Sequence, residues 1–246
     1  MQRLKDKTAL ITGAAKRLGA ALAQGIAAEG AHVVIHCNHS RNEAENTADA
    51  IIDLGGSASV IEADLADTAL ADTLIGRVIA ATGPVDILIN NASIFEEVSF
   101  MGMEPGPIHK NIDIHAVSPM LIARRFAEQR RKGVIINMLD TMVMDYDRHH
   151  VPYHLSKRML HTLTRIMAVE FAPNIRVNAI APGLILPPPG KGIEYLESLV
   201  HSNPLHRHGG ATDVVEAALY LLHAEFVTGQ TLFIDGGRHL RGNMYE

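Results

Sequence analysis

The chain contains little cysteine, no block of like charges and no long apolar run. Its 246 residues include one cysteine, Cys37, which excludes an intramolecular disulfide framework and a cysteine-based zinc cluster and fits a reducing compartment. The net charge of −5 is spread along the sequence, which argues against nucleic acid or an acidic membrane surface as a partner. No apolar stretch reaches the length of a signal peptide or a membrane span. We therefore expect a soluble, cytoplasmic protein.

The composition is that of an ordinary globular protein. Hydrophobic residues make up 47% and charged residues 20% of the chain, and no repeat, low-complexity tract or linker divides it. The 14 histidines are scattered, and no His-x-x-x-His pair falls on an expected helix, so we interpret them as solvated surface residues and expect no metal site. One domain over residues 1–246 is the expected organisation.

Strand-like and helix-like segments alternate along the whole chain. Strands are expected at residues 8–12, 31–36, 58–62, 85–90, 134–137, 175–180 and 231–234. Helices are expected between them, including a long one from about Pro107 to Arg130 and one that begins at Pro152, since proline is favoured in a first helical turn. This alternation predicts an α/β fold with a doubly wound, seven-stranded parallel sheet.

A glycine-containing turn joins the first strand to the first helix. The run Gly13-Ala-Ala-Lys-Arg-Leu-Gly19 would let the backbone approach a diphosphate, whose charge the helix N-terminus stabilises. After the second strand, where a carboxylate would hold the ribose hydroxyls of NAD, come His36, Asn38, His39, Ser40 and Arg41. With Arg17 expected nearby, these side chains favour NADPH, because its 2′-phosphate gains charge-assisted hydrogen bonds.

A tyrosine and a lysine stand four residues apart on the helix that begins at Pro152. Tyr153 and Lys157 would share one helix face, with the ammonium lowering the pKa of the phenol and making it a proton donor. Asp140 follows the strand at 134–137 and would stand at its carboxyl end, where parallel sheets place ligand crevices. The three side chains are expected to face one pocket.

In order and spacing, these motifs resemble the short-chain dehydrogenases/reductases over nearly the whole chain. The matching residues are Thr12-Gly13…Gly19, Asp64, Asn90-Asn91-Ala92-Ser93, Tyr153…Lys157 and Pro182-Gly183. The resemblance implies a single-domain Rossmann fold, a nicotinamide cofactor and a homotetramer. It implies cofactor contacts at Gly13, Arg17, Leu18, Gly19, His36, His39, Ser40, Arg41, Asp64, Leu65, Asn91, Ala92, Ser93, Lys157, Pro182 and Gly183. Asp64 would accept from the adenine amino group, and Lys157 would bind the ribose.

Three departures from the usual family pattern resemble the pteridine and dihydromonapterin reductases. Arg17 and Ser93 replace glycines, and Asp140 replaces the catalytic serine. In that subfamily an aromatic residue shortly after Asn-Ala-Ser stacks on the pterin, and Phe95 is placed for it. The ending Gly236-Gly-Arg-His-Leu-Arg241 is similar as well. A further departure, His115, replaces the asparagine that usually holds a proton-relay water, so the resemblance leaves that relay open.

The expected activity is NADPH-dependent reduction of a 7,8-dihydropterin. Asp140, Tyr153 and Lys157 would be catalytic, and Ser93, Phe95, Asp140 and Tyr153 would bind the substrate. Dihydromonapterin is favoured, with dihydrofolate and dihydrobiopterin open. One alternative is a carbonyl reductase such as a 3-oxoacyl reductase, with Thr141 supplying the hydroxyl that the serine position lacks. Another is an NADP-sensing regulator without turnover, although its expected mark is the loss of the Tyr/Lys pair.

Overall fold

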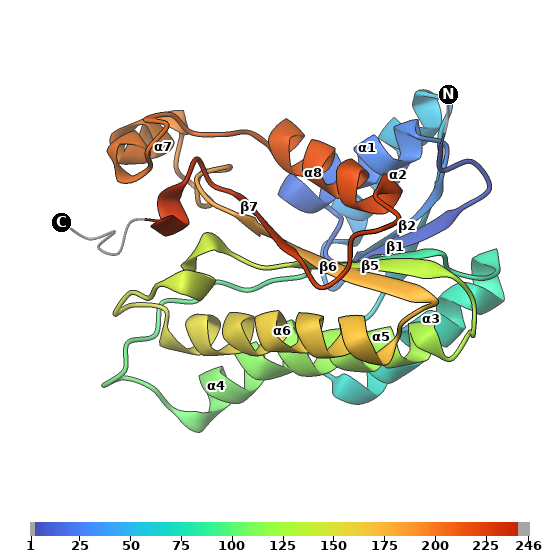
Figure 1. Cartoon of the computed structure of the whole chain (residues 1–246), viewed down its shortest axis with the longest axis horizontal. Coiled ribbons are helices and arrows are strands. Elements are labelled where there is room, and N and C mark those ends of the chain that lie inside the picture. Colours follow the sequence, from blue (N-terminus) through green and yellow to red (C-terminus); the bar gives the residue numbers. More distant parts are fainter. Residues whose placement is uncertain (1–2, 241–246) are drawn as a thin grey trace.

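The computed structural model describes residues 3–240. Seven strands form one sheet in the order β3-β2-β1-β4-β5-β6-β7, and every neighbouring pair is parallel (Figure 1). The strands are β1 (Thr8–Ile11), β2 (His32–Cys37), β3 (Ser57–Glu62), β4 (Ile87–Asn90), β5 (Gly133–Met138), β6 (Ile175–Pro182) and β7 (Thr231–Ile234). The predicted doubly wound, seven-stranded parallel sheet is confirmed.

Helices cover both faces of this sheet. One face carries α1 (Arg17–Ala28), α2 (Arg41–Asp53) and α8 (Ala211–His223), and the other carries α3 (Thr68–Thr82), α4 (Pro105–Ile112), α5 (Ser118–Ala127) and α6 (Val151–Glu170) (Figure 1). The core follows the same division, with one large apolar cluster on each face of the sheet and a smaller third cluster that includes Leu139 and Leu160. A short helix, α7 (Ile193–Leu199), lies on the side where α6 begins.

The expected long helix from Pro107 to Arg130 is interrupted. The chain forms α4, then a π-turn, η1 (Asp113–Val117), and then α5. Pro119 has no backbone N–H, so it cannot give His115 the hydrogen bond that an α-helix would supply from four residues further on. This interruption was not predicted from the sequence. His115, which lies in the interrupting segment, is buried.

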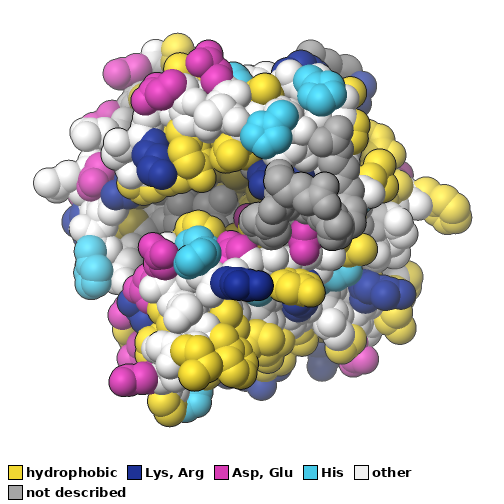
Figure 2. All heavy atoms as spheres, turned by 90° about the vertical axis from the view of Figure 1, so that its left-hand side faces the viewer, with side chains coloured by type: hydrophobic (Ala, Val, Ile, Leu, Met, Phe, Trp, Pro, Cys, Tyr) yellow, Lys and Arg dark blue, Asp and Glu magenta, His cyan; other side chains and the backbone are white. Residues whose placement is uncertain are grey.

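The strand order places the carboxyl ends of β1, β4 and β5 next to one another. The order reverses between β1 and β4, and such a reversal is where open parallel sheets hold their ligands. Figure 2 shows that the side of the molecule carrying α7 is hollowed, with hydrophobic, acidic and histidine side chains around the hollow. Across residues 3–240, no helix combines the length and the hydropathy needed to cross a bilayer.

Candidate active site

The turn after β1 is held by side-chain contacts to the segment after β4. The Thr12 hydroxyl accepts the backbone N–H groups of Asn91 (2.9 Å) and Ala92 (3.0 Å), and the Asn91 amide donates to the carbonyls of Thr12 and Gly13. Gly13 has φ +63°, and a Cβ at Gly19 would collide with the Gly13 carbonyl. Both glycines are therefore required for this close approach of backbone to backbone.

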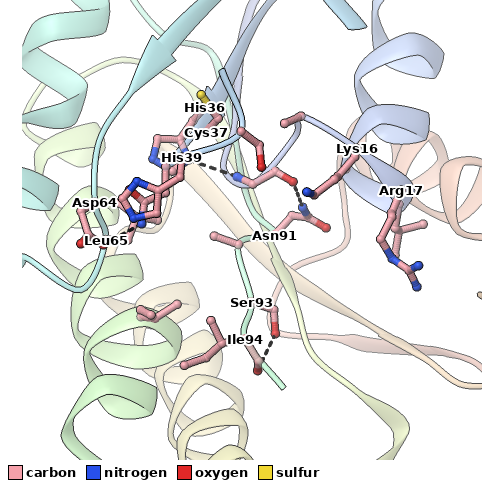
Figure 3. Close-up of a pocket in the computed structure, with 18 residues that line it drawn as sticks. Lys16, Arg17, His36, Cys37, His39, Asp64, Leu65, Asn91, Ser93 and Ile94 are labelled. Carbon is pink, nitrogen blue, oxygen red and sulfur yellow. Dashed lines mark hydrogen bonds between the residues drawn. The ribbon is translucent and has the colours of Figure 1, made fainter. Parts of the chain in front are cut away.

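A cavity opens beside this turn (Figure 3). Of the residues predicted to bind the cofactor, those that line it are Gly13, Arg17, Leu18, Gly19, His36, His39, Ser40, Asp64, Leu65, Asn91, Ala92 and Ser93. Arg41, Lys157, Pro182 and Gly183 are not among its lining residues. The Asp64 carboxylate accepts hydrogen bonds from the Asn38 amide (3.1 Å) and the Ala66 N–H (2.9 Å), which hold it at the cavity wall.

His36 lines the cavity, but its ring is committed to the backbone. Its Nδ1 accepts the Gly13 N–H at 3.1 Å, so the proton is on Nε2, which donates to the Ala63 carbonyl at 3.0 Å. Burial lowers the pKa of His36 to about 4. The prediction that His36 helps to bind a phosphate is therefore wrong, because the ring is neutral and has no free nitrogen. It links β2 to the glycine turn.

The two arginines expected near the 2′-phosphate point elsewhere. Arg17 donates through Nη2 to the Pro187 carbonyl at 2.6 Å, and in Figure 3 it lies at the opposite end of the cavity from His39. Arg41 pairs with Glu45 at 2.9 Å on its own helix. The predicted contact of either guanidinium with that phosphate does not fit these positions, because each is held by a partner away from it.

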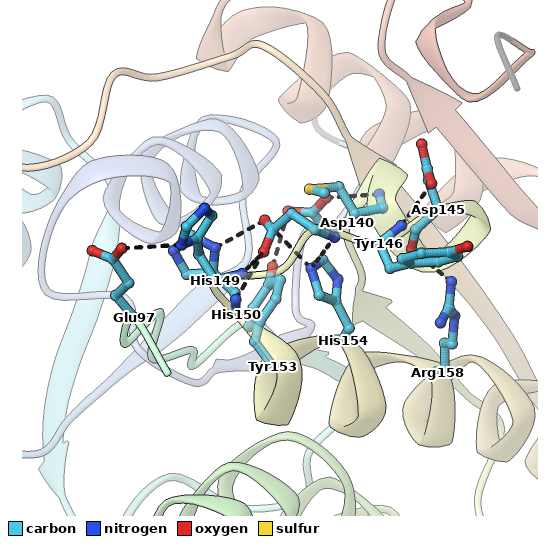
Figure 4. A network of polar contacts seen from close by, with 11 residues as sticks. Glu97, Asp140, Asp145, Tyr146, His149, His150, Tyr153, His154 and Arg158 are labelled. Atoms are coloured by element: carbon cyan, nitrogen blue, oxygen red, sulfur yellow. Dashed lines mark hydrogen bonds and ion pairs between the residues drawn. The ribbon is translucent and has the colours of Figure 1, made fainter. Parts of the chain in front are cut away.

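Asp140, Tyr153 and Lys157 lie close to one another, although none of the three is among the lining residues of the cavity beside the glycine turn. Asp140 follows β5, and its Oδ1 accepts the Met142 N–H at 2.8 Å while its Oδ2 accepts the Tyr153 hydroxyl at 2.9 Å. Lys157 lies one helical turn beyond Tyr153 and donates through Nζ to the Met138 carbonyl at 2.8 Å. Figure 4 shows the Tyr153 ring pointing from α6 toward Asp140.

The electrostatics at this cluster differ from the prediction. Burial, and next the charge and hydrogen bond of Asp140, raise the pKa of Tyr153 well above its ordinary range. Burial lowers the pKa of Lys157 to about 8, while Asp140 acts in the opposite direction. The Lys157 ammonium lies 5.7 Å from the centre of the phenol ring. The expected lowering of the tyrosine pKa by Lys157 is wrong for this arrangement, because the carboxylate is bonded directly to the hydroxyl.

Phe95 stands at the mouth of the same cluster. The residue is 52% exposed, and its ring meets Tyr153 edge-on at 4.7 Å between centroids and stacks on His150 at 3.8 Å. His150 was not predicted to lie at the site, although its position four residues before His154 was the available signal. His150 therefore covers one face of the ring expected to stack on a substrate.

Three of the histidines interpreted as surface residues are buried, namely His36, His115 and His154. His150 and His154 both approach the Asp147 carboxylate, at 2.8 Å and 3.4 Å (Figure 4). Among residues 3–240, no group of three or more His, Cys, Asp or Glu side chains is placed to hold a metal ion.

Comparisons with known proteins identify the family of the chain. A family model described as "Enoyl-(Acyl carrier protein) reductase" matches residues 13–239. The chain belongs to the short-chain dehydrogenase/reductase family. It is therefore an oxidoreductase with a small-molecule substrate. A sequence relative in this family, 3beta-hydroxysteroid dehydrogenase 1 of Eggerthella lenta, is 34% identical over 96% of this chain and 95% of its own.

Two solved structures of the family resemble the whole chain. FolM alternative dihydrofolate reductase 1 from Brucella canis, complexed with NADP, has a TM-score of 0.92 and 32% identity, covering 100% of this chain and 98% of its own. The Brucella suis protein of that name, also in complex with NADP, has a TM-score of 0.91 and 33% identity, covering 99% and 98%. The nicotinamide cofactor expected from the sequence agrees with both complexes.

The structure describes only part of the C-terminal run, Gly236 to Arg241, that resembles the dihydromonapterin reductases. Arg238 and His239 belong to a short 3₁₀ turn, η4 (Arg238–Leu240), and His239 contacts the Asp235 carboxylate at 2.9 Å. Arg241 lies outside the described residues. The homotetramer and the cytoplasmic location stay predictions.

Proposed function

We propose that this chain reduces a 7,8-dihydropterin with NADPH to the tetrahydro form. The observation that carries the proposal is the 2.9 Å hydrogen bond from the Tyr153 hydroxyl to Asp140, at the position where most family members have a serine. A serine hydroxyl can donate a hydrogen bond to the oxygen of a carbonyl substrate. A carboxyl group can also accept from the N–H groups at the edge of a nitrogenous ring, or carry a proton to a ring nitrogen. The two FolM structures support the same substrate class.

We still propose that the protein prefers NADPH to NADH, but we now assign the 2′-phosphate to a different set of residues. No acid follows β2 at the cavity, and His39 and Ser40 stand at the N-terminus of α2, which stabilises an anion. A charge-assisted hydrogen bond to the 2′-phosphate contributes about 1.5–3 kcal/mol, roughly tenfold to a hundredfold in affinity. We therefore expect His39→Ala with Ser40→Ala to reduce the NADPH preference, and Arg17→Ala to leave it unchanged.

When bound, NADPH supplies the hydride for the imine carbon. Tyr153 would give its proton to the imine nitrogen, which would leave a phenolate beside the Asp140 carboxyl group. Two adjacent negative charges are unfavourable, so Asp140 would take up a proton as Tyr153 loses one. Asp140 is partly exposed and can exchange that proton with water, whereas the buried Lys157 ammonium would stabilise the phenolate.

We propose dihydromonapterin as the preferred pterin and weaker reduction of dihydrofolate, with dihydrobiopterin as a further possible substrate. The bulky aminobenzoyl tail of a folate would have to leave the pocket past Pro187, whose carbonyl is held by Arg17. The pterin ring would lie between Phe95 and the nicotinamide and gain stacking worth about 0.5–1.5 kcal/mol beyond area burial. Because His150 stacks on one face of the Phe95 ring, the pterin would have to bind the opposite face or displace His150.

The carbonyl reductase alternative is supported by the name of the steroid dehydrogenase relative. The hydroxyl that it would need is already engaged, because Thr141 is buried and donates to Asp235 at 2.6 Å. Thr141 therefore cannot replace the missing serine without giving up that bond. A regulator without turnover would not need the buried Tyr153 and Lys157 pair, whose burial is costly.

A turnover screen tests the proposal. NADPH oxidation would be followed with dihydromonapterin, dihydrobiopterin, dihydrofolate and an acetoacetyl thioester, with the wild type and with Asp140→Ser. We expect dihydropterin turnover by the wild type and its loss in Asp140→Ser, with any gain restricted to the thioester. Reduction of the thioester alone would replace this proposal with the carbonyl reductase. No turnover of any compound, with NADPH still bound, would favour the regulator.

A further inference from the structure

His115 connects the segment after β4 to the catalytic helix. It lies in the π-turn η1 and is 1% exposed. Its Nε2 is 3.0 Å from the Ile94 backbone nitrogen and 3.0 Å from the Ser93 hydroxyl, and its Nδ1 is 2.8 Å from the Ser156 hydroxyl. Ser156 donates in turn to the Tyr153 carbonyl at 2.9 Å. One ring therefore spans the distance between the cofactor cavity and the helix that carries Tyr153.

The donors along this path assign the proton of the His115 ring and that of the Ser156 hydroxyl. The Ile94 N–H can only donate, so Nε2 of His115 is unprotonated, and the Ser93 hydroxyl can donate to the same nitrogen. The proton of the neutral ring is then on Nδ1 and points to Ser156, whose own proton goes to the Tyr153 carbonyl. Both nitrogens of the ring are fully used.

The surroundings keep the ring uncharged. Burial, and next the Lys157 ammonium, lower the pKa of His115 well below its ordinary value. The groups that face it are the polar atoms of Ser93, Ile94 and Ser156 and the edge-on ring of Tyr153, with centroids 5.4 Å apart. None of these is a carboxylate that would favour the imidazolium.

We propose that His115 is a positioning residue: as a neutral Nδ1–H imidazole it fixes α6, and with it the Tyr153 hydroxyl, against the Ser93-Ile94 edge of the cofactor cavity. It does not carry protons, because moving one through the ring would leave Ile94 or Ser156 without its partner. The proton that Tyr153 donates would then be replaced through Asp140. The inference rests on the proposed function only in taking Tyr153 as the proton donor.

Three substitutions separate this role from simple packing. His115→Phe keeps the aromatic volume beside Tyr153 and removes every hydrogen bond of the ring. His115→Gln has an amide with one acceptor and one donor that can replace Nε2 and Nδ1. His115→Asn restores the residue of most family members but is too short to reach both Ile94 and Ser156. Since a misplacement of about 1 Å can cost a hundredfold in rate, we expect kcat to fall about tenfold to a hundredfold in the Phe and Asn variants.

The remaining readouts distinguish positioning from loss of folding or of cofactor binding. We expect His115→Gln to recover kcat to within a few fold of the wild type, and NADPH affinity to be unchanged in all three variants. Ser156→Ala removes both hydrogen bonds of the Ser156 hydroxyl, the one from His115 and the one to the Tyr153 carbonyl. Adding it to His115→Phe should cost clearly less than the sum of the two single losses, because both substitutions interrupt the same connection. Full kcat in His115→Phe, additive losses in the double variant, or a loss confined to NADPH affinity would overturn the proposal.

Nitrogen NMR of the histidine ring in the free protein provides a test that does not depend on the substrate. We expect a protonated Nδ1, a bare Nε2 and no titration of His115 between pH 5 and 8. An Nε2–H tautomer or a titration in that range would overturn the positioning role. If the NMR result holds while no dihydropterin is reduced, the proposed function fails and the role of His115 in placing α6 remains.

Discussion

Replacing Lys157 with methionine should stabilise the free protein at neutral pH. Lys157 is 3% exposed, and burial lowers the pKa of its ammonium from 10.5 to about 8. The folded state therefore holds this proton less readily than the unfolded chain does. Below pH 8, Lys157 is protonated in both states, and the full free-energy cost of burying its charge opposes folding. Between about pH 8 and 10.5 the unfolded chain binds more protons, so stability rises with pH.

The magnitude follows from that difference in pKa. A fall of roughly 2.5 units, at about 1.36 kcal/mol per unit, costs about 3 kcal/mol of folding free energy at pH 7. Lys157→Met also loses the hydrogen bond from Nζ to the Met138 carbonyl, worth about 1 kcal/mol. We therefore expect the variant to be about 2 kcal/mol more stable than the wild type at pH 7, and no more stable near pH 10.5.

Urea unfolding of the free protein, from pH 7 to pH 10, measures this difference. The matched control is Lys132→Met, which removes an exposed ammonium and should change stability by less than about 0.5 kcal/mol at either pH. The reasoning is refuted if Lys157→Met is less stable than the wild type at pH 7, or if the difference between them does not shrink as pH rises. A confirmed result would show that the chain keeps this charge at the expense of stability, as functional sites do.

Three further substitutions test the site. Tyr153→Phe should lower dihydropterin turnover by at least about tenfold and leave NADPH affinity intact, and a smaller loss in steady-state kinetics would require another proton donor. Gly19→Ala should abolish NADPH binding in a fluorescence titration, because its Cβ would collide with the Gly13 carbonyl and come within 2.7 Å of the Asn91 amide; normal binding would show that the turn can shift. Phe95→Ala should raise the dihydropterin KM roughly twofold to tenfold through lost stacking, and an unchanged KM would contradict the proposed ring position.

The alternation of strands and helices was sufficient to predict the fold. Buried parallel strands are continuous apolar runs, such as Ile-Leu-Ile at the start of Ile87–Asn90, and the helices between them are amphipathic, so both patterns can be recognised in the sequence. The π-turn at Asp113–Val117 was missed although its cause, Pro119, is visible in the sequence. Proline is common in the first turn of a helix, so Pro119 alone does not indicate an irregularity. It interrupts the hydrogen-bond pattern here because another helix runs directly into it.

Backbone placement at the site was easier to predict than side-chain direction. Asp140 and Tyr153 meet because a strand end and a helix start are fixed by the fold. His36 and Arg17 were assigned to a phosphate because of their charge and their place in the chain, yet each found a backbone partner that the sequence does not show. For His36 these partners are Gly13 and Ala63, both distant in sequence.

The charges around Tyr153 explain why the histidine at position 115 is compatible with catalysis. Lys157 is the buried cation near the His115 ring, and the Asp140 carboxylate accepts a hydrogen bond from the Tyr153 hydroxyl. A charged imidazole would repel the ammonium and compete with it for the phenolate that the proposed reduction would form. Because the Ile94 N–H occupies Nε2, protonating His115 would also break a hydrogen bond in the interior. The backbone that holds the ring thus also keeps it neutral, and Tyr153 is left to exchange protons with Asp140.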